Sequence, residues 1–153
     1  MEDNKKVEDE NTPVFQIQRI YIKDISFEAP LAPEIFQKDW KPDVKFDVNS
    51  SSNSLSNDLY EVVLSLTVTA KIEDNVAFIC EVKQAGIFHI KNLPEEAMSH
   101  AKGAGCPNIL FPYARETITA LVTKGTFPPL YVAPINFDAV YAQQIEKKKV
   151  TEH

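Results

Sequence analysis

The stretch 59-LYEVVLSLTVTAKI-72 determines the fold class, because apolar and polar residues alternate along its whole length. A period of two is typical of a strand that is buried on one face only. The apolar face would consist of Tyr60, Val62, Leu64, Leu66, Val68, Ala70 and Ile72. Residues 73–75 (EDN) suit a turn, and the same alternation resumes from Val76 to Ile90. The two stretches together predict a long β-hairpin.

Two more strands are expected before this hairpin. The segment Val14–Glu28 has the composition of a strand, but its apolar residues switch from odd to even positions and back. That slip predicts a bulge, or a change of the covered face, near Arg19 and near Lys23. A Pro-rich segment follows that is long enough for a crossover, and then Val44–Val48 alternates cleanly. The serine- and asparagine-rich segment 49–58 is expected to be a loop.

The segment 106-CPNILFPYARETITALVTKG-125 predicts a helix that is buried on two sides. At the helical period, one broad apolar stripe contains Leu110, Phe111, Ala114, Ile118, Leu121 and Val122. A second stripe contains Ile109, Tyr113 and Ala120. Asn108 suits the N-cap, and Gly125 suits the position just past the helix. The chain's own sheet can cover one stripe, while the other needs a second domain or a second subunit. In a chain of 153 residues a second subunit is the better expectation.

The remaining segments complete an α+β architecture. A short helix is expected over Glu95–Lys102, followed by a loop at residues 103–105, and the apolar linker 127-FPPLYVAPI-135 precedes a last helix. One side of that helix would carry Phe137, Val140, Tyr141 and Ile145. The expected fold is a four-stranded antiparallel sheet in Greek-key order, with helices packed on one face. Residues 13–146 would form this domain, between a disordered acidic tail (1–12) and a second disordered tail (147–153).

Composition narrows the class of partner. A net charge of −6 and a pI near 5.1 disfavour nucleic acid and anionic membranes, and they permit a basic partner. No apolar run approaches the length of a membrane span, and the charged N-terminal residues lack the apolar core of a secretory signal. Two cysteines, Cys80 and Cys106, are too few for a disulfide framework. A cytoplasmic protein with free thiols is therefore expected.

The sequence carries no motif for catalysis or metal binding. His89 and His100 lie near neither a carboxylate pair nor a cysteine pair at ligand spacing, so no metal site is expected. Cys106 precedes a proline at a helix start, where a thiolate could be favoured, but a buried structural thiol is the better interpretation. Glycine-rich phosphate-binding motifs are missing. The sequence predicts neither an enzyme nor a cofactor.

The polar face of the predicted sheet suggests a docking surface. Asp24 and Glu28 on the first strand and Glu81 on the fourth would share this face with Ile79, an apolar residue among carboxylates. Two interpretations are open. The face is either a solvated surface with one stray isoleucine, or a surface that docks a basic, partly apolar partner.

A further group of apolar residues exceeds what the core needs. Trp40 and Phe36 lie in the crossover, the linker 127–135 is apolar, and Val44–Val48 could be an edge strand. Loops folded onto the core would explain these residues one by one. Together they could instead line a groove that accepts extended apolar chain segments with little sequence specificity.

Three stretches resemble SecB, the family of bacterial protein-export chaperones: 15-FQIQRIYIKDISFEAPLAPEIFQKDW-40, 106-CPNILFPYARETIT-119 and 125-GTFPPLYVAPINFDA-139. The resemblance extends from about Val14 to Val140. It implies an ATP-independent cytoplasmic holdase that assembles as a homotetramer, a dimer of dimers. Such a protein binds unfolded secretory precursors and delivers them to SecA, the motor ATPase of the translocase. A chaperone dedicated to one antitoxin-like client is the competing interpretation, and the carboxylates of the polar face favour the first.

The resemblance also implies site residues. The positions that dock SecA match Asp24, Glu28, Ile79 and Glu81, where the family commonly has Leu in place of the Ile. The client groove matches Trp40, Val44, Phe46, Val48, Phe137, Val140 and Tyr141. The interface between dimers would include Ile109, Tyr113, Ile118, Ala120 and Leu121. The C-terminal segment departs from the family because it is short and lysine-rich.

Overall fold

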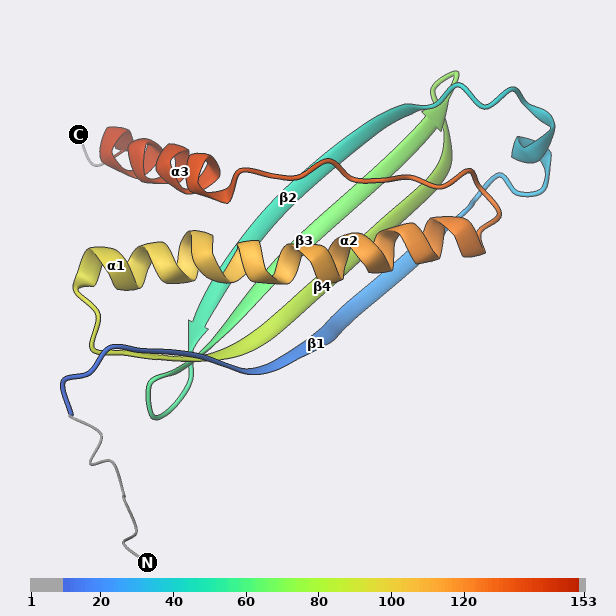
Figure 1. Ribbon diagram of the computed structural model, residues 1–153. Coiled ribbons are helices and arrows are strands. Elements are labelled where there is room, and N and C mark those ends of the chain that lie inside the picture. The colour runs from blue at the N-terminus through green and yellow to red at the C-terminus, as the bar shows by residue number, and fades with distance from the viewer. Residues whose placement is uncertain (1–9, 152–153) are drawn as a thin grey trace, which may run out of the picture.

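The computed structural model describes residues 10–151, which form one antiparallel sheet with the helices on one of its faces (Figure 1). The strands are β1 (Val14–Glu28), β2 (Asp43–Ser54), β3 (Leu59–Ile72) and β4 (Asn75–Lys91). The helices are α1 (Glu95–His100), α2 (Cys106–Lys124) and α3 (Phe137–Thr151). Two short turns complete the list: a 3₁₀ turn, η1 (Glu34–Gln37), and a π-helical turn, η2 (Ala101–Gly105). The predicted α+β class is confirmed.

The strand order is β1–β4–β3–β2, and every neighbouring pair is antiparallel. The strands β2, β3 and β4 follow one another directly, while residues 29–42 carry the chain from β1 at one edge to β2 at the other. The β3–β4 turn has two central residues, Glu73 and Asp74, with φ of 51° and 65°. Positive φ at both positions is the turn geometry that matches the twist of a hairpin. The predicted Greek-key order is confirmed.

β1 contains both irregularities that the sequence predicts. Its register against β4 shifts between Ile17 and Arg19, and again between Ile22 and Asp24. Each extra residue reverses the parity of the side chains that follow, which returns the apolar ones to the face that bears the helices. Six apolar side chains of β1 lie opposite even-numbered residues of β4: Phe15, Ile17, Ile20, Ile22, Ile25 and Phe27.

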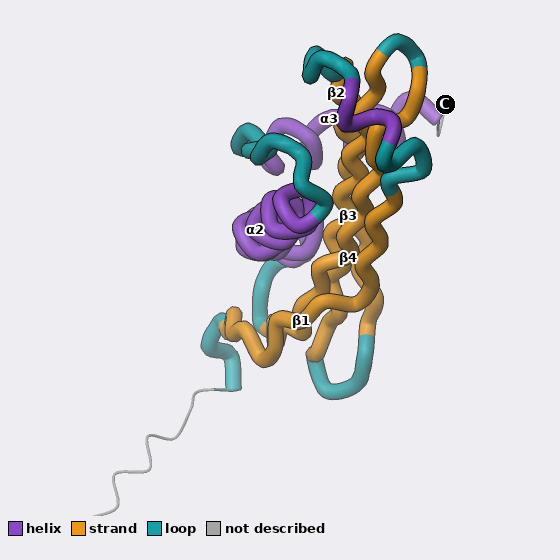
Figure 2. Tube along the Cα trace, turned by 90° about the vertical axis from the view of Figure 1, so that its right-hand side faces the viewer, coloured by secondary structure: helices purple, strands orange, loops and turns teal. Residues whose placement is uncertain are grey.

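The core lies between the sheet and α2. The even-numbered residues of β3 from Val62 to Ile72 are at most 4% exposed. From α2, the fully buried side chains include Leu110, Ala114, Ile118 and Val122. Because α2 runs over β3 and β4 (Figure 2), the chain's own sheet covers the broad apolar stripe of this helix. The inner face of β1 lies beside α2 and receives little cover from it.

The predicted break between the first two helices is wrong. α1, η2 and α2 follow one another with helical backbone, so residues 103–105 form no loop and Asn108 is no N-cap. Glycine lowers helix propensity, which suggested a break. In the structure Gly103 instead allows a close contact with α3, because a Cβ there would lie 2.5 Å from the Tyr141 ring.

Two predicted irregular segments are partly regular. The segment 49–58 was expected to be a loop, yet β2 continues to Ser54, because β3 offers a pairing partner as far as Tyr60. α3 extends through Thr151, so the predicted tail 147–153 is partly helical. Most of the predicted N-terminal tail, 1–12, lies outside the described residues. Within residues 10–151, no helix combines the length and the apolar character needed to cross a membrane.

Candidate functional site

The outer face of the sheet, opposite the helices, brings four predicted docking residues together. Glu28 pairs with Ile79, and the next outward pair includes Glu81. Asp24 lies one step further along β1, opposite Lys83. We call Asp24, Glu28, Ile79 and Glu81 the acidic patch. Asp24 and Glu28 are exposed and form no salt bridge with another described residue.

Glu81 has only weak partners on this face. The Nζ atom of Lys83 lies 3.9 Å from its carboxylate, and the Thr67 hydroxyl donates to it over 3.5 Å. Its side chain remains 38% exposed. Contacts this long contribute little stability, so the three carboxylates of the patch are accessible to a positively charged partner.

A polar cluster crosses the outer face beside the acidic patch. The Tyr21 hydroxyl on β1 donates to the Glu61 carboxylate on β3, and Lys23 Nζ lies 2.8 Å from Glu61 Oε1. Because β4 lies between these strands, the Tyr21 side chain must pass over Ala85, its pairing partner. Ala85 faces outward and is nevertheless 0% exposed. We call the cluster of Tyr21, Lys23 and Glu61 the Tyr21 bridge.

The bridge perturbs the ionisation of both acids in it. Burial, together with the hydrogen bond to Glu61, raises the pKa of Tyr21 to about 12. The hydrogen bonds from Lys23 and Tyr21 lower the pKa of the Glu61 carboxyl. Sequence reasoning missed this cluster, because its residues lie far apart along the chain and only the order β1–β4–β3 brings them together.

An apolar groove runs along the inner face of β2. It is a depression of about 340 Å³ whose lining is almost entirely apolar. The sheet contributes Val44, Phe46 and Val68, and the linker contributes residues 130–135. Val44 and Phe46 are predicted groove residues. The excess of apolar side chains in the Pro-rich linker indicated that this segment could line a groove. The sequence alone did not show which strand the linker lies against.

The other predicted groove residues are dispersed. Val48 lies half-buried further along the inner face of β2. Trp40 packs at the crossover end of the sheet, with its ring 5.4 Å from that of Phe127. Phe137 is only 5% exposed and packs against Phe111, so its assignment to the groove is wrong: it has almost no surface left for a client.

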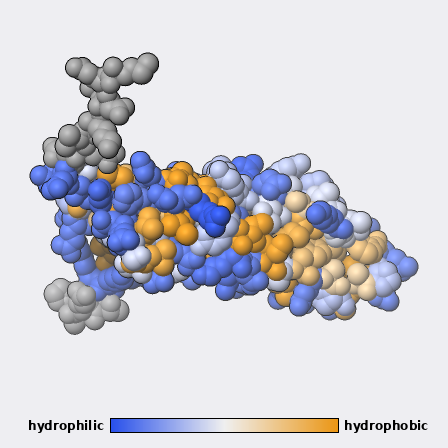
Figure 3. Space-filling model, turned by 90° about the horizontal axis from the view of Figure 1, so that it is seen from below, coloured by the Kyte–Doolittle hydropathy of each residue, from blue (hydrophilic) through white to orange (hydrophobic). Residues whose placement is uncertain are grey.

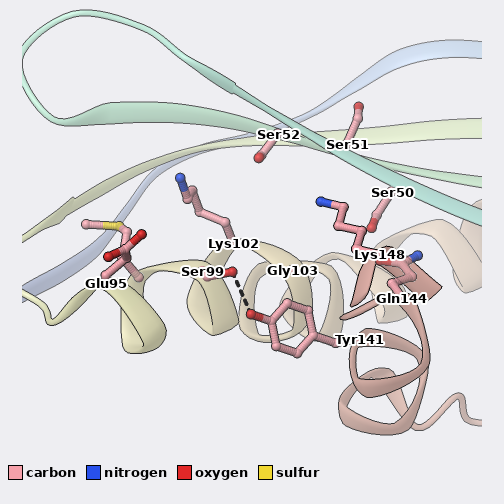
Figure 4. Close-up of a pocket in the computed structure, with 11 residues that line it drawn as sticks. Ser50, Ser51, Ser52, Glu95, Ser99, Lys102, Gly103, Tyr141, Gln144 and Lys148 are labelled. Atoms are coloured by element: carbon pink, nitrogen blue, oxygen red, sulfur yellow. Dashed lines mark hydrogen bonds between the residues drawn. The ribbon is translucent and has the colours of Figure 1, made fainter. Parts of the chain in front are cut away.

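Val140 and Tyr141 lie on α3, and Tyr141 lines a polar pocket of about 430 Å³ at the other end of β2 (Figure 4). The pocket is lined from β2 by Ser50 and Ser52 and from the helices by Lys102 and Tyr141. The Tyr141 hydroxyl lies 2.5 Å from Ser99 Oγ. Nearby, His100 Nε2 lies 2.6 Å from Asp138 Oδ1. These polar contacts hold α3 against α1 and η2, so Tyr141 is separated from the apolar groove.

Exposed apolar surface remains on the helix side of the sheet. On the inner face of β1, four apolar side chains are between 41% and 49% exposed: Phe15, Ile17, Ile22 and Ile25. Figure 3, seen from below, shows apolar patches along the length of the molecule. On α2, Tyr113 is 50% exposed, while Ile109, Ala120 and Leu121 are half-buried. Ile118 is fully buried within the chain, so its predicted place at an interface is wrong.

The described residues offer little for catalysis. Residues 10–151 contain no group of three or more His, Cys, Asp or Glu side chains that could hold a metal ion. Both thiols are buried, and burial raises the pKa of Cys80 to about 11 and that of Cys106 to about 12. A thiolate is therefore disfavoured at either position.

Known proteins resemble this chain closely. The sequence model described as "SecB: Preprotein translocase subunit SecB" matches residues 8–148. Two similar proteins of Pseudomonas fluorescens are each named protein-export protein SecB. That of strain Pf-5 is 56% identical over 144 residues, which are 94% of this chain and 91% of the relative. That of strain Pf0-1 is 58% identical over 140 residues, 92% of this chain and 87% of the relative.

A solved structure shows the same fold at lower sequence similarity. It is a SecB-like chaperone of Mycobacterium tuberculosis in complex with a peptide from the HigA1 antitoxin. The TM-score is 0.61 at 18% identity, and the match covers 79% of this chain and 90% of that chain.

The Tyr21 bridge predicts a specific loss of stability in alkali. The pKa of Tyr21 is raised from 10 to about 12, so the bridge contributes stability that is complete below pH 10 and is lost as the pH rises through about 12. Tyr21→Phe should remove this pH-dependent part of the free energy of unfolding. Tyr131→Phe, at a position that is 71% exposed, should retain it. Urea unfolding between pH 9 and pH 12 measures the difference. An unchanged pH dependence in Tyr21→Phe would contradict the bridge.

Proposed function

We infer the function from one premise: the chain belongs to the SecB family of protein-export chaperones, which bind proteins and are not enzymes. We propose that it holds unfolded secretory precursors in the cytoplasm without ATP and delivers them to SecA. The observation that carries this proposal is the two-sided sheet. The apolar groove opens on the helix side and the acidic patch lies on the outer side, so one chain can bind a client and the motor together.

The chemistry of the groove supports the holding of unfolded chains. An extended segment that buries apolar side chains against Val44, Phe46 and the linker gains roughly 25 cal/mol per Å² of buried surface. Much of this gain is offset by the ordering of the client, so each segment binds weakly. Several grooves in one oligomer would raise the avidity for a long chain by about 10²–10⁴. Native proteins are excluded because they expose few long apolar segments.

The choice of client class follows from the relatives. The Mycobacterium tuberculosis chaperone, whose structure contains an antitoxin peptide, supports peptide binding by this fold. Its low identity makes a dedicated antitoxin-like client the weaker candidate here. The two Pseudomonas fluorescens relatives, which share more than half of their residues with this chain, are named as export proteins. We therefore propose secretory precursors as the clients.

We also propose that the chain assembles as a homotetramer, a dimer of dimers. The support is the exposed apolar surface on the inner face of β1 and on the flank of α2, which is more than an isolated chain would leave in water. The interface residues that retain accessible surface are Ile109, Tyr113, Ala120 and Leu121.

The holding proposal predicts that Phe46→Asp weakens client binding about tenfold, because it removes an apolar contact and places a charge in the groove. Asn49→Asp is the matched control, because it adds the same charge to the outer face of the same strand. The measurement is light scattering of a denatured precursor after dilution, with each variant at equal concentration. Suppression of aggregation by Phe46→Asp that equals the wild type would place the client site elsewhere.

The docking proposal predicts that Glu81→Lys weakens SecA binding roughly tenfold at low salt, while client holding is unchanged. Wild-type affinity should fall as salt rises, because the attraction is screened. Glu96→Lys makes the same charge change on α1, away from the outer face, and should bind SecA normally. Calorimetric titration at two salt concentrations provides the test. Wild-type affinity in Glu81→Lys would remove the patch from SecA recognition.

The assembly proposal predicts a species of about 69 kDa, four times the 17.2 kDa chain, in sedimentation at micromolar concentration. Tyr113→Asp should shift the protein to smaller species, because it places a charge in the proposed interface. Asn108→Asp, at an exposed position in the first turn of the same helix, should sediment as the wild type. A wild-type protein that sediments as a monomer would refute the assembly.

A further inference from the structure

The outer face of the sheet has two ends of opposite charge, with the Tyr21 bridge between them. The acidic patch lies on one side of the bridge. On the other side, Arg19 of β1 lies opposite Ile87 of β4. Arg19 is exposed, and its side chain forms no salt bridge with any residue in the described range.

The bridge keeps the middle of this face close to neutral. Lys23 and Glu61 are paired at 2.8 Å, so their charges cancel locally. Tyr21 stays protonated at neutral pH, since its pKa is raised to about 12, and its side chain covers Ala85. The patch carboxylates lie at one end, with Lys83 beside them at 3.9 Å from Glu81, and the Arg19 guanidinium lies at the other end.

An isoleucine lies at each end of this face. Ile79 lies within the acidic patch and Ile87 lies opposite Arg19, both half-buried on the outer face of β4. Glu81 and Ile87 are six positions apart, which corresponds to roughly 20 Å along a strand. An extended segment of about six or seven residues spans this distance. The face thus fits a segment with one charge at each end and an apolar side chain beside each charge.

We propose that Arg19 binds an anionic group on the same partner segment whose basic residues bind the acidic patch. This inference rests on the proposed docking of SecA and deepens it, because it assigns the partner a composition: cationic at one end and anionic at the other, with an apolar residue beside each charge. Arg suits this role because its planar guanidinium binds a carboxylate with two parallel hydrogen bonds. A segment with basic residues alone would use only one end of the face.

Two synthetic peptides test the assignment. Each carries a lysine pair at one end and the same uncharged spacer of about six residues. The other end carries a glutamate pair in one peptide and a glutamine pair in the other. Binding is measured by fluorescence anisotropy at low ionic strength, where exposed charge pairs are least screened. The wild type should bind the glutamate peptide about threefold more tightly than the glutamine peptide, the magnitude expected for one exposed ion pair.

Charge variants separate a local contact from a general field. In Arg19→Gln the preference should disappear, and in Arg19→Glu the glutamine peptide should bind more tightly. Lys45→Gln is the matched control, because it removes the same charge from an exposed position on the opposite edge strand. It should retain the threefold preference.

The possible failures are distinguishable. Equal binding of both peptides by the wild type, or a preference that survives in Arg19→Gln, would overturn the role of Arg19 and leave the acidic patch in place. Failure of the wild type to bind either peptide would overturn both the inference and the docking proposal.

Discussion

The burial of one face of the β3–β4 hairpin beneath α2 is the interaction on which the remaining structure depends. It fixes the even-numbered side chains of both strands in the core and thereby turns the odd-numbered ones outward. The outer face can then carry charge without loss of core packing. On the inner side, α2 covers the centre of the sheet and leaves its two edges differently exposed. β2 lies beside the linker and forms the apolar groove, while β1 retains bare apolar side chains.

The sheet could be predicted from the sequence because strand periodicity is a local property with a strong signal. The alternation from Leu59 onward defines the hairpin, and the parity slips in Val14–Glu28 locate both bulges of β1. The same logic placed the acidic patch, because parity alone puts Glu81 and Ile79 on the outer face. Where local composition predicted the wrong secondary structure, contacts with residues distant in the sequence determined the structure that forms. β3 holds Ser50–Ser54 in a strand, and Tyr141 packs against Gly103 within a continuous helix.

The candidate sites were less predictable because they depend on distances between segments that are remote in sequence. A helical wheel assigns Ile118 to an apolar side, but it does not show how much of that side the chain's own sheet covers. Apolar composition marked the linker, but only its path along β2 made it a wall of the groove. The same limit explains Phe137, whose apolar character served packing against Phe111 and not the binding of a client. The Tyr21 bridge had no signal in the sequence, because its hydrogen bond spans two strand-to-strand steps.

The interleaving of the two faces along β4 has a consequence for how this sequence can change. Phe78, Cys80 and Val82 point into the core, and Ile79, Glu81 and Lys83 between them point outward. Substitutions can therefore alter one face and spare the other. The loss or gain of a single residue just before this run would exchange the two sets, and Glu81 and Lys83 would turn toward the core. β1 lies at the edge of the sheet and absorbs two extra residues as bulges along its length, whereas β4 is paired on both sides and has one irregularity, between Val76 and Phe78 near its start, with an unbroken pairing to β3 beyond it. Divergence in this protein is thus expected to preserve the length of β4 more strictly than the identity of its outward residues.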